Sequence, residues 1–222
     1  MQAQTAVVIG ATGLIGEQLV QELLQDNTFS KVVLLVRRPL QLSHHKLEIR
    51  LVDFNNLSDL SARLGTGQAV FCCVGTTRNQ VQGDKDAYRK IDYDIPVHTA
   101  QLACRQGFTQ FLVVSAVGAS TASGNFYLQL KGSMEEDVRA FPIRSIHIFR
   151  PSLLLGTRKE FRLAERIAQA ILPAVSFLMP GSLRRYRAIH SKLVAKAMLV
   201  AARNAEPGTH TYEYDEIRYL AR

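Results

Sequence analysis

Short runs of apolar and β-branched residues recur along the first two thirds of the chain. Each run is continuously apolar, without strict alternation of apolar and polar positions, which is typical of strands covered on both faces in a parallel sheet. The pattern therefore predicts six buried strands, at residues 5–9, 31–36, 47–52, 68–74, 110–115 and 143–149.

Between these runs, apolar residues recur at helical spacing. Several of these segments end in glycine, such as Gly65 and Gly107, and glycine commonly terminates a helix. Because strands and helices alternate, we expect an α/β fold built on a doubly wound, mainly parallel sheet. The predicted helices are residues 14–25, 57–64, 86–105 and 127–140.

The pattern becomes less regular after Pro151. Residues 159–172 have the spacing of an amphipathic helix, and residues 191–203 predict a second helix. Residues 209–214 predict a late strand.

The composition is that of an ordinary globular protein, with 47% hydrophobic and 21% charged residues, and this excludes disordered and fibrous classes. A chain of 222 residues is long enough for one domain with a large core. We expect a single domain over residues 1–222, in which residues 1–157 form the α/β core and residues 158–222 a small C-terminal cap.

The net charge of +8 raises nucleic acid, anionic lipid and phosphorylated ligands as partners. Residues 158–222 carry 12 of the 27 Lys and Arg residues but only 6 of the 19 Asp and Glu residues. These basic residues are not interleaved with aromatic ones and Trp is absent, so we do not expect nucleic-acid binding.

The chain contains three cysteines and shows no secretory signal. Together these features predict free thiols and a cytoplasmic location. Its longest apolar stretch, residues 168–179, is shorter than the roughly 20 residues that span a bilayer, so no transmembrane segment is expected. The six histidines do not show metal-ligand spacing, and we expect no metal site.

A glycine-rich turn, Gly10-Ala-Thr-Gly13-Leu-Ile-Gly16, follows the first predicted strand and opens the first helix. Gly10 permits a tight turn, Gly13 lets backbone N–H groups approach a pyrophosphate, and Gly16 lets helix and strand pack closely. A glycine-rich turn without a ligand is the alternative. The strand before the turn and the helix after it favour dinucleotide binding. We therefore expect residues 1–157 to form a dinucleotide-binding core, with the cap at residues 158–222 beside the substrate.

Arg37 and Arg38 directly follow the second predicted strand, where NAD-preferring proteins carry an Asp or Glu that binds the ribose 2′-hydroxyl. Paired guanidinium groups suit a 2′-phosphate instead, so the sequence favours NADP over NAD, with Arg37 as the closer contact. The simpler alternative is a solvated basic turn.

Two further segments end predicted strands at the same edge of the sheet. Asp53 can accept a hydrogen bond from an adenine amino group, although a turn or capping aspartate is the alternative. The segment Val74-Gly75-Thr76 lies where ligands of open α/β sheets bind, and Gly75 allows close approach to the cofactor ribose.

Tyr127 and Lys131 are four residues apart on a predicted helix, and Ser115 ends the preceding strand. Positions i and i+4 share one helix face, so the Lys131 ammonium can approach the Tyr127 hydroxyl. We expect this charge to lower the pKa of Tyr127 and make it a general acid or base, with Ser115 hydrogen-bonding the substrate oxygen. A surface helix with a solvated lysine is the alternative.

These motifs together resemble the short-chain dehydrogenase/reductase superfamily, and most closely its atypical branch of Tat-interacting-protein-like oxidoreductases with a Rossmann fold. The resemblance covers residues 5–157. It implies catalysis by Ser115, Tyr127 and Lys131, with Lys131 also binding nicotinamide ribose. It further implies cofactor binding by Gly10, Thr12, Gly13, Leu14, Ile15 and Gly16 at the pyrophosphate, Arg37 at the 2′-phosphate, and Asp53 with Phe54 at the adenine.

The chain departs from this family at two places. Many members carry an Asn on the helix before the fifth strand that anchors a water relay, whereas residues 90–94 here contain none. Members with sugar-nucleotide substrates have a longer C-terminal domain than residues 158–222 can form.

The sequence thus predicts an NADP-dependent oxidoreductase that moves hydride between nicotinamide and a small carbonyl or alcohol substrate. A cofactor-sensing module that binds another protein is the first alternative, and a nucleotide-sugar epimerase or dehydratase the second. The helices at 86–105 and 127–140 could pair across a two-fold axis in a homodimer.

Overall fold

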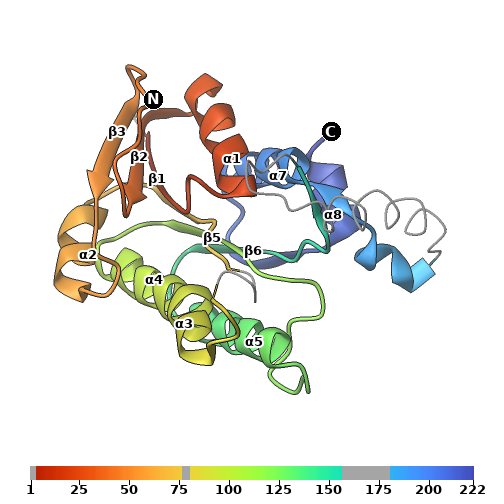
Figure 1. Cartoon of the computed structure of the whole chain (residues 1–222). Helices are drawn as coiled ribbons and strands as arrows, with labels where there is room; N and C mark the ends of the chain where they lie inside the picture. The colour runs from red at the N-terminus through yellow and green to blue at the C-terminus, as the bar shows by residue number, and fades with distance from the viewer. Residues whose placement is uncertain (1–3, 77–80, 157–180) are drawn as a thin grey trace.

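The central sheet has seven strands in the order β3-β2-β1-β4-β5-β6-β9, and every neighbouring pair runs parallel (Figure 1). The computed structural model describes residues 4–76, 81–156 and 181–222. The strand order reverses at β1 and β4, and ligands of doubly wound sheets bind at such a point. The strands are β1 Gln4–Ile9, β2 Phe29–Val36, β3 Leu47–Leu51, β4 Ala69–Cys72, β5 Gln110–Val114, β6 Ser145–Phe149 and β9 Gly208–Tyr212.

Helices cover both faces of this sheet (Figure 1). α1 (Leu14–Gln25) and α7 (Ser191–Asn204) pack on one face, while α4 (Ile95–Arg105) and α5 (Phe126–Arg139) pack on the other. The other regular elements are α2 Leu57–Leu64, α3 Lys85–Arg89, η1 Lys90–Asp94, η2 Gly181–Tyr186, α8 Tyr214–Leu220, and the short paired strands β7 Leu154–Leu155 and β8 Ile189–His190.

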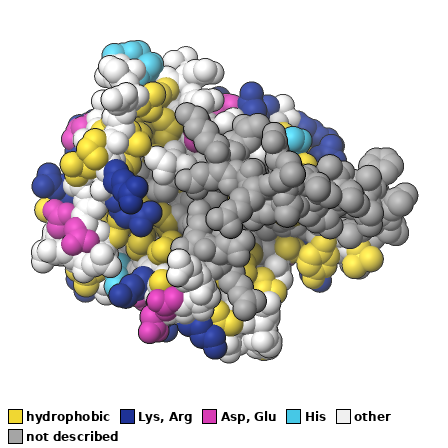
Figure 2. All heavy atoms as spheres, viewed as in Figure 1, with side chains coloured by type: hydrophobic (Ala, Val, Ile, Leu, Met, Phe, Trp, Pro, Cys, Tyr) yellow, Lys and Arg dark blue, Asp and Glu magenta, His cyan; other side chains and the backbone are white. Residues whose placement is uncertain are grey.

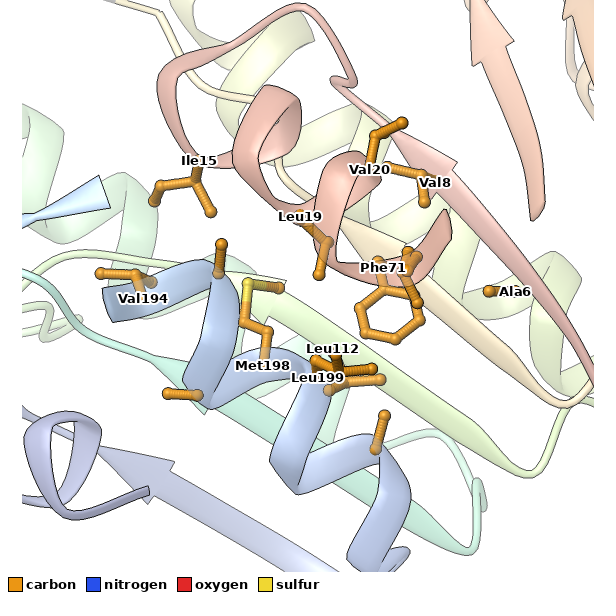
Figure 3. Close-up of a cluster of buried hydrophobic side chains, with 14 of the residues drawn as sticks. Ala6, Val8, Ile15, Leu19, Val20, Phe71, Leu112, Val194, Met198 and Leu199 are labelled. Carbon is orange, nitrogen blue, oxygen red and sulfur yellow. The ribbon is translucent and has the colours of Figure 1, made fainter. Parts of the chain in front are cut away.

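Apolar side chains fill the space between the helices and the sheet. On the α1 face, Leu19 of α1, Phe71 of β4 and Met198 of α7 are fully buried in one cluster (Figure 3). Burial of each such side chain stabilises the folded chain by about 1.5–3 kcal/mol. Because both faces are buried, the strands require the continuously apolar runs seen in the sequence.

All six predicted strands are present, and the helices predicted at 14–25 and 57–64 have the observed bounds. The helices predicted at 127–140 and 191–203 match α5 and α7 to within one residue. The α/β class and the doubly wound, mainly parallel sheet are therefore confirmed.

The helix predicted at 86–105 is confirmed as a continuous helical segment, although it is irregular: α3, the π-helical turn η1 and α4 follow one another without a break. In η1 the backbone N–H of Ile95 donates to the carbonyl of Lys90, five residues earlier. Pro96 explains the irregularity, because its nitrogen has no hydrogen to donate and its ring clashes with the carbonyl four residues earlier, that of Asp92. A π-helical turn relieves that conflict; such turns are rare in proteins and frequently lie at functional sites.

The C-terminal part of the chain contributes to the sheet and its covering layer. α7 packs against α1, and β9 adds the seventh strand beside β6. The strand predicted at 209–214 is observed as β9, which begins one residue earlier and ends two residues earlier. It ends at Tyr212 because Glu213 forms a capping box with Glu216 at the start of α8. The helix predicted at 159–172 lies outside the described residues.

Within residues 4–76, 81–156 and 181–222, no helix is long and apolar enough to cross a membrane. On the face shown in Figure 2, Lys and Arg side chains lie in separate groups, with Asp and Glu side chains among them. Among the described residues visible on this face, the basic side chains therefore do not form one continuous patch.

Candidate active site

The glycine-rich turn joins β1 to α1 through very close backbone contacts. Gly10 has a φ of +83°, and a Cβ atom there would lie 2.6 Å from the carbonyl carbon of Cys73. A Cβ atom on Gly16 would lie 2.1 Å from the carbonyl oxygen of Gly10. Both positions therefore require glycine for β1, α1 and the end of β4 to pack together.

This turn ends in Gly13, the residue that precedes α1, and in the described structure no side chain caps the helix there. The first-turn amides and the positive end of the helix dipole suit an anionic pyrophosphate. Thr12 is exposed and Leu14 partly so, whereas the Ile15 side chain is buried in the core. Ile15 can therefore offer a ligand only its backbone.

Arg37 and Arg38 follow β2, one strand away from the glycine-rich turn, at the same edge of the sheet. Both are exposed, and neither forms an ion pair with a carboxylate in the part of the chain that the structure describes. This arrangement fits a 2′-phosphate.

Asp53 occupies a turn at the start of α2. Its carboxylate accepts hydrogen bonds from the backbone N–H (2.9 Å) and the side-chain amide (3.1 Å) of Asn55. Its own N–H donates to Asp59. Phe54 is half-buried against the core. Asp53 thus has a structural role in the turn, and its contact with adenine stays a prediction.

Lys131 is buried on α5, with 1% of its side chain exposed. Its ammonium lies 2.9 Å from Asp92 Oδ1 and donates to the Val114 carbonyl at 3.3 Å. The other Asp92 oxygen accepts from the backbone N–H of Thr76 at 2.9 Å. The end of β4, with Val74, Gly75 and Thr76, is thereby joined to the candidate catalytic helix.

The structure contradicts the expected decrease in the pKa of Tyr127. Burial raises this pKa; the Lys131 ammonium lowers it, and the Asp92 carboxylate raises it further. The ammonium does not prevail because burial of the phenol is the largest contribution to this pKa, and the Asp92 carboxylate beside the ammonium offsets part of its field. Burial alone would lower the pKa of Lys131, but Asp92 and Tyr127 raise it on balance, so Lys131 stays charged.

Ser115 follows β5 and is buried, and its hydroxyl donates to Glu135 Oε1 at 2.5 Å. Arg150 binds the same carboxylate through two nitrogens, at 2.6 and 2.9 Å, and Arg139 binds it at 3.1 Å. Since its hydroxyl proton is already donated, Ser115 can offer a ligand only acceptor lone pairs.

Sequence reasoning missed three residues around this centre. Asp92 lies in η1, and Pro96 four residues later was the available indication of an irregular helix. Glu135 continues the four-residue spacing of Tyr127 and Lys131. Tyr88 of α3 had no such signal, although its ring centre lies 5.7 Å from that of Tyr127.

Tyr88 closes one side of the centre. Its hydroxyl oxygen lies 3.4 Å from the Thr76 carbonyl oxygen, and burial raises its pKa to about 12. Tyr88 therefore remains a neutral hydrogen-bond donor at neutral pH. Among the described residues, no group of three His, Cys, Asp or Glu side chains could hold a metal ion.

The fold is shared with solved structures of dinucleotide-dependent enzymes. MoeE5 in complex with UDP-glucose and NAD superposes with a TM-score of 0.70, covering 98% of this chain and 80% of that protein. At 19% identity, this likeness shows the fold alone.

Sequence comparison identifies closer relatives. The chain is 32% identical over 202 residues to Protein HTATIP2 of Rattus norvegicus, covering 90% of this chain and 81% of the relative. It is 31% identical over 208 residues to the mitochondrial protein FMP52 of Debaryomyces hansenii, covering 92% of this chain and 89% of the relative. A family model described as NAD(P)H-binding matches residues 10–150. The chain belongs to this NAD(P)H-binding family, in the atypical branch of the short-chain dehydrogenases/reductases.

Proposed function

We propose that the protein is an NADP-dependent oxidoreductase that transfers hydride between nicotinamide and a small carbonyl or alcohol substrate. One observation carries this proposal: Tyr127 and the buried, charged Lys131 lie on α5, next to the carboxyl ends of β4 and β5. The cofactor supplies the hydride when it is bound.

Each candidate cofactor residue has a distinct part in this proposal. The amides at Gly10, Thr12, Gly13, Leu14, Ile15 and Gly16 would surround the pyrophosphate. Arg37, assisted by Arg38, would bind the 2′-phosphate through charge-assisted hydrogen bonds. Asp53 and Phe54 would contact the adenine, and Val74, Gly75, Thr76 and Lys131 the ribose next to nicotinamide.

Tyr127 would give its proton to the substrate oxygen while the carbonyl carbon receives hydride. Its raised pKa keeps the phenol protonated at neutral pH, which suits the acid required for reduction. The Lys131 ammonium would stabilise the phenolate left behind, and Tyr127 would regain a proton from solvent. Ser115 would accept a hydrogen bond from the alcohol product, because its own proton is held by Glu135.

We also propose a cytoplasmic location, although the fungal relatives named as mitochondrial make the mitochondrion the alternative compartment. A homodimer and a separate protein partner are compatible with this function. Cell fractionation and the measured mass of the protein in solution would distinguish these possibilities.

Replacement of Tyr127 by Phe tests the mechanism directly. With NADPH and a panel of aldehydes, ketones and quinones, we expect turnover to fall about 100-fold to 10,000-fold, since the acid is removed. NADPH binding, followed by its fluorescence, should stay unchanged. Tyr219→Phe makes the same change at an exposed residue of α8 and should preserve turnover.

Unchanged turnover in Tyr127→Phe would refute the mechanism. Tight NADPH binding by the wild-type protein without turnover of any carbonyl would favour the cofactor-sensing alternative.

A further inference from the structure

Asp92 and Lys131 form a buried ion pair at the centre of the candidate site. Their side chains are 0% and 1% exposed, and the charged atoms lie 2.9 Å apart. Within the described parts of the chain, no other ion pair has both side chains this deeply buried. Charges are costly to remove from water, so a pair in this position needs a specific reason.

The chain places Asp92 by an unusual backbone feature. The residue lies in the π-helical turn η1, directly before the helix that begins at Ile95. Its carboxylate connects two elements, since Oδ1 faces Lys131 of α5 and Oδ2 accepts from Thr76 after β4. A Cβ atom on Gly75 would lie 3.4 Å from Oδ1, so the loop runs directly against the carboxylate.

The charge of Asp92 matters beyond these contacts. Four titratable groups interact with one another or with Asp92 here: Lys131 and Tyr127 from α5, Tyr88 from α3 and Cys72 from β4. With Asp92 ionised, Lys131 charged and the other groups neutral, the net charge of the centre is zero. A neutral amide at the same position could accept the Thr76 N–H equally well, but the centre would then carry one positive charge.

We propose that Asp92 is a positioning residue whose carboxylate holds the buried Lys131 ammonium in place and sets the pH range over which Tyr127 can act as an acid. The catalytic part of this inference rests on the proposed oxidoreductase function. The electrostatic part depends only on the geometry of the pair.

The test compares Asp92→Asn with Asp94→Asn. Asp94 is two residues away in η1 and pairs with exposed Arg89 at 3.5 Å, so it gives the same substitution outside the centre. Without the Asp92 charge, the centre releases its first proton more readily. The alkaline limb of the pH profile for NADPH-dependent reduction should therefore move about 1 to 3 pH units lower in Asp92→Asn. Asp94→Asn should keep the wild-type profile.

A second measurement does not require turnover. Tyrosinate formation is followed by difference absorbance, and the signal of Tyr127 is isolated by subtracting a matched Tyr127→Phe protein. This ionisation should also occur at lower pH in Asp92→Asn than in wild type. An unshifted ionisation overturns the inference. Retained turnover in Tyr127→Phe overturns the proposed acid but leaves this titration interpretable.

Asp92→Asn leaves a buried ammonium without its partner and can fail to fold. In that case, the double variant Asp92→Asn/Lys131→Met is compared with Lys131→Met by thermal unfolding. If the two side chains act as a pair, the double variant folds although Asp92→Asn alone does not, because it no longer buries an unpaired ammonium. A double variant that also fails to fold, while Lys131→Met folds, shows that Asp92 acts without Lys131 and overturns the inference.

Discussion

On α5, Tyr127, Lys131, Glu135 and Arg139 follow one another at intervals of four residues and so share one helix face. Lys131 pairs with Asp92, while Glu135 pairs with Arg139 and with Arg150 from the end of β6. Tyr127 forms no such pair among the described residues, and its phenol is the group left to meet a ligand. The chemistry of each residue on this face is set by its partner as much as by its own type.

At the residue scale, the proposed preference for NADP over NAD depends on Arg37. Replacement of Arg37 by Ser would remove the proposed charge-assisted contact with the 2′-phosphate, and such a contact contributes about 1.5–3 kcal/mol. NADPH should bind about 10-fold to 100-fold more weakly, while NADH binding should stay constant. Fluorescence titration with each cofactor measures both. Arg144, exposed before β6 at the opposite edge of the sheet, gives a control in Arg144→Ser.

If Arg37→Ser weakened the binding of NADPH and of NADH equally, Arg37 would not bind the 2′-phosphate. A loss seen only with Arg38→Ser would assign that contact to the neighbouring residue.

At the element scale, the polar ends of helices determine where the site residues lie. Asn125 caps α5 and accepts hydrogen bonds from the N–H groups of Tyr127 and Leu128, at 3.0 and 3.2 Å. Asn56 caps α2 in the same way, far along the chain from α5. Asn56 and Asn125 therefore make the same capping hydrogen bonds. They differ because only the helix capped by Asn125 has Tyr127 in its first turn.

This pair of caps permits a matched prediction. Asn125→Ala and Asn56→Ala should each lower the free energy of unfolding by about 1 kcal/mol, measured with denaturant. Only Asn125→Ala should also reduce kcat, because Tyr127 lies in the first turn of α5. Equal effects of the two variants on kcat would contradict a role for this cap in catalysis.

At the scale of the whole molecule, β6 and β9 join the C-terminal part of the chain to the sheet through an aromatic cluster. His147 of β6 is fully buried, its Nδ1 lies 3.0 Å from the Tyr212 hydroxyl, and its ring stacks on His210 of β9. Burial lowers the pKa of His147 to about 4, with a smaller contribution from His210. The histidine is thus neutral in the folded protein at neutral pH.

This burial makes stability depend on pH. In the unfolded chain His147 binds a proton below about pH 6.5, whereas in the folded chain it binds one only below about pH 4. The free energy of unfolding should therefore fall by about 2 kcal/mol between pH 7 and pH 5. Denaturant titrations of His147→Gln should lack this decrease, whereas exposed His45→Gln should retain it. If the free energy of unfolding of His147→Gln fell between pH 7 and pH 5 as in wild type, another group would cause the decrease.

Local patterns determined much of this protein without tertiary information. Continuous apolar runs predict the strands, since a strand covered on both faces needs apolar side chains at successive positions. Glycine at positions 10 and 16 and the four-residue spacing of Tyr127 and Lys131 are equally local. These features identified the fold and the edge of the sheet that carries the candidate site.

Tertiary structure decided what depends on distant residues and on burial. Asp92 and Lys131 meet although 39 positions separate them, and Ser115 donates to Glu135 in place of a substrate. The direction of the Tyr127 pKa reverses because burial and a third charge outweigh the ammonium one turn away. Sequence spacing determines which side chains share a face; the free energy of a charge depends on everything packed around it.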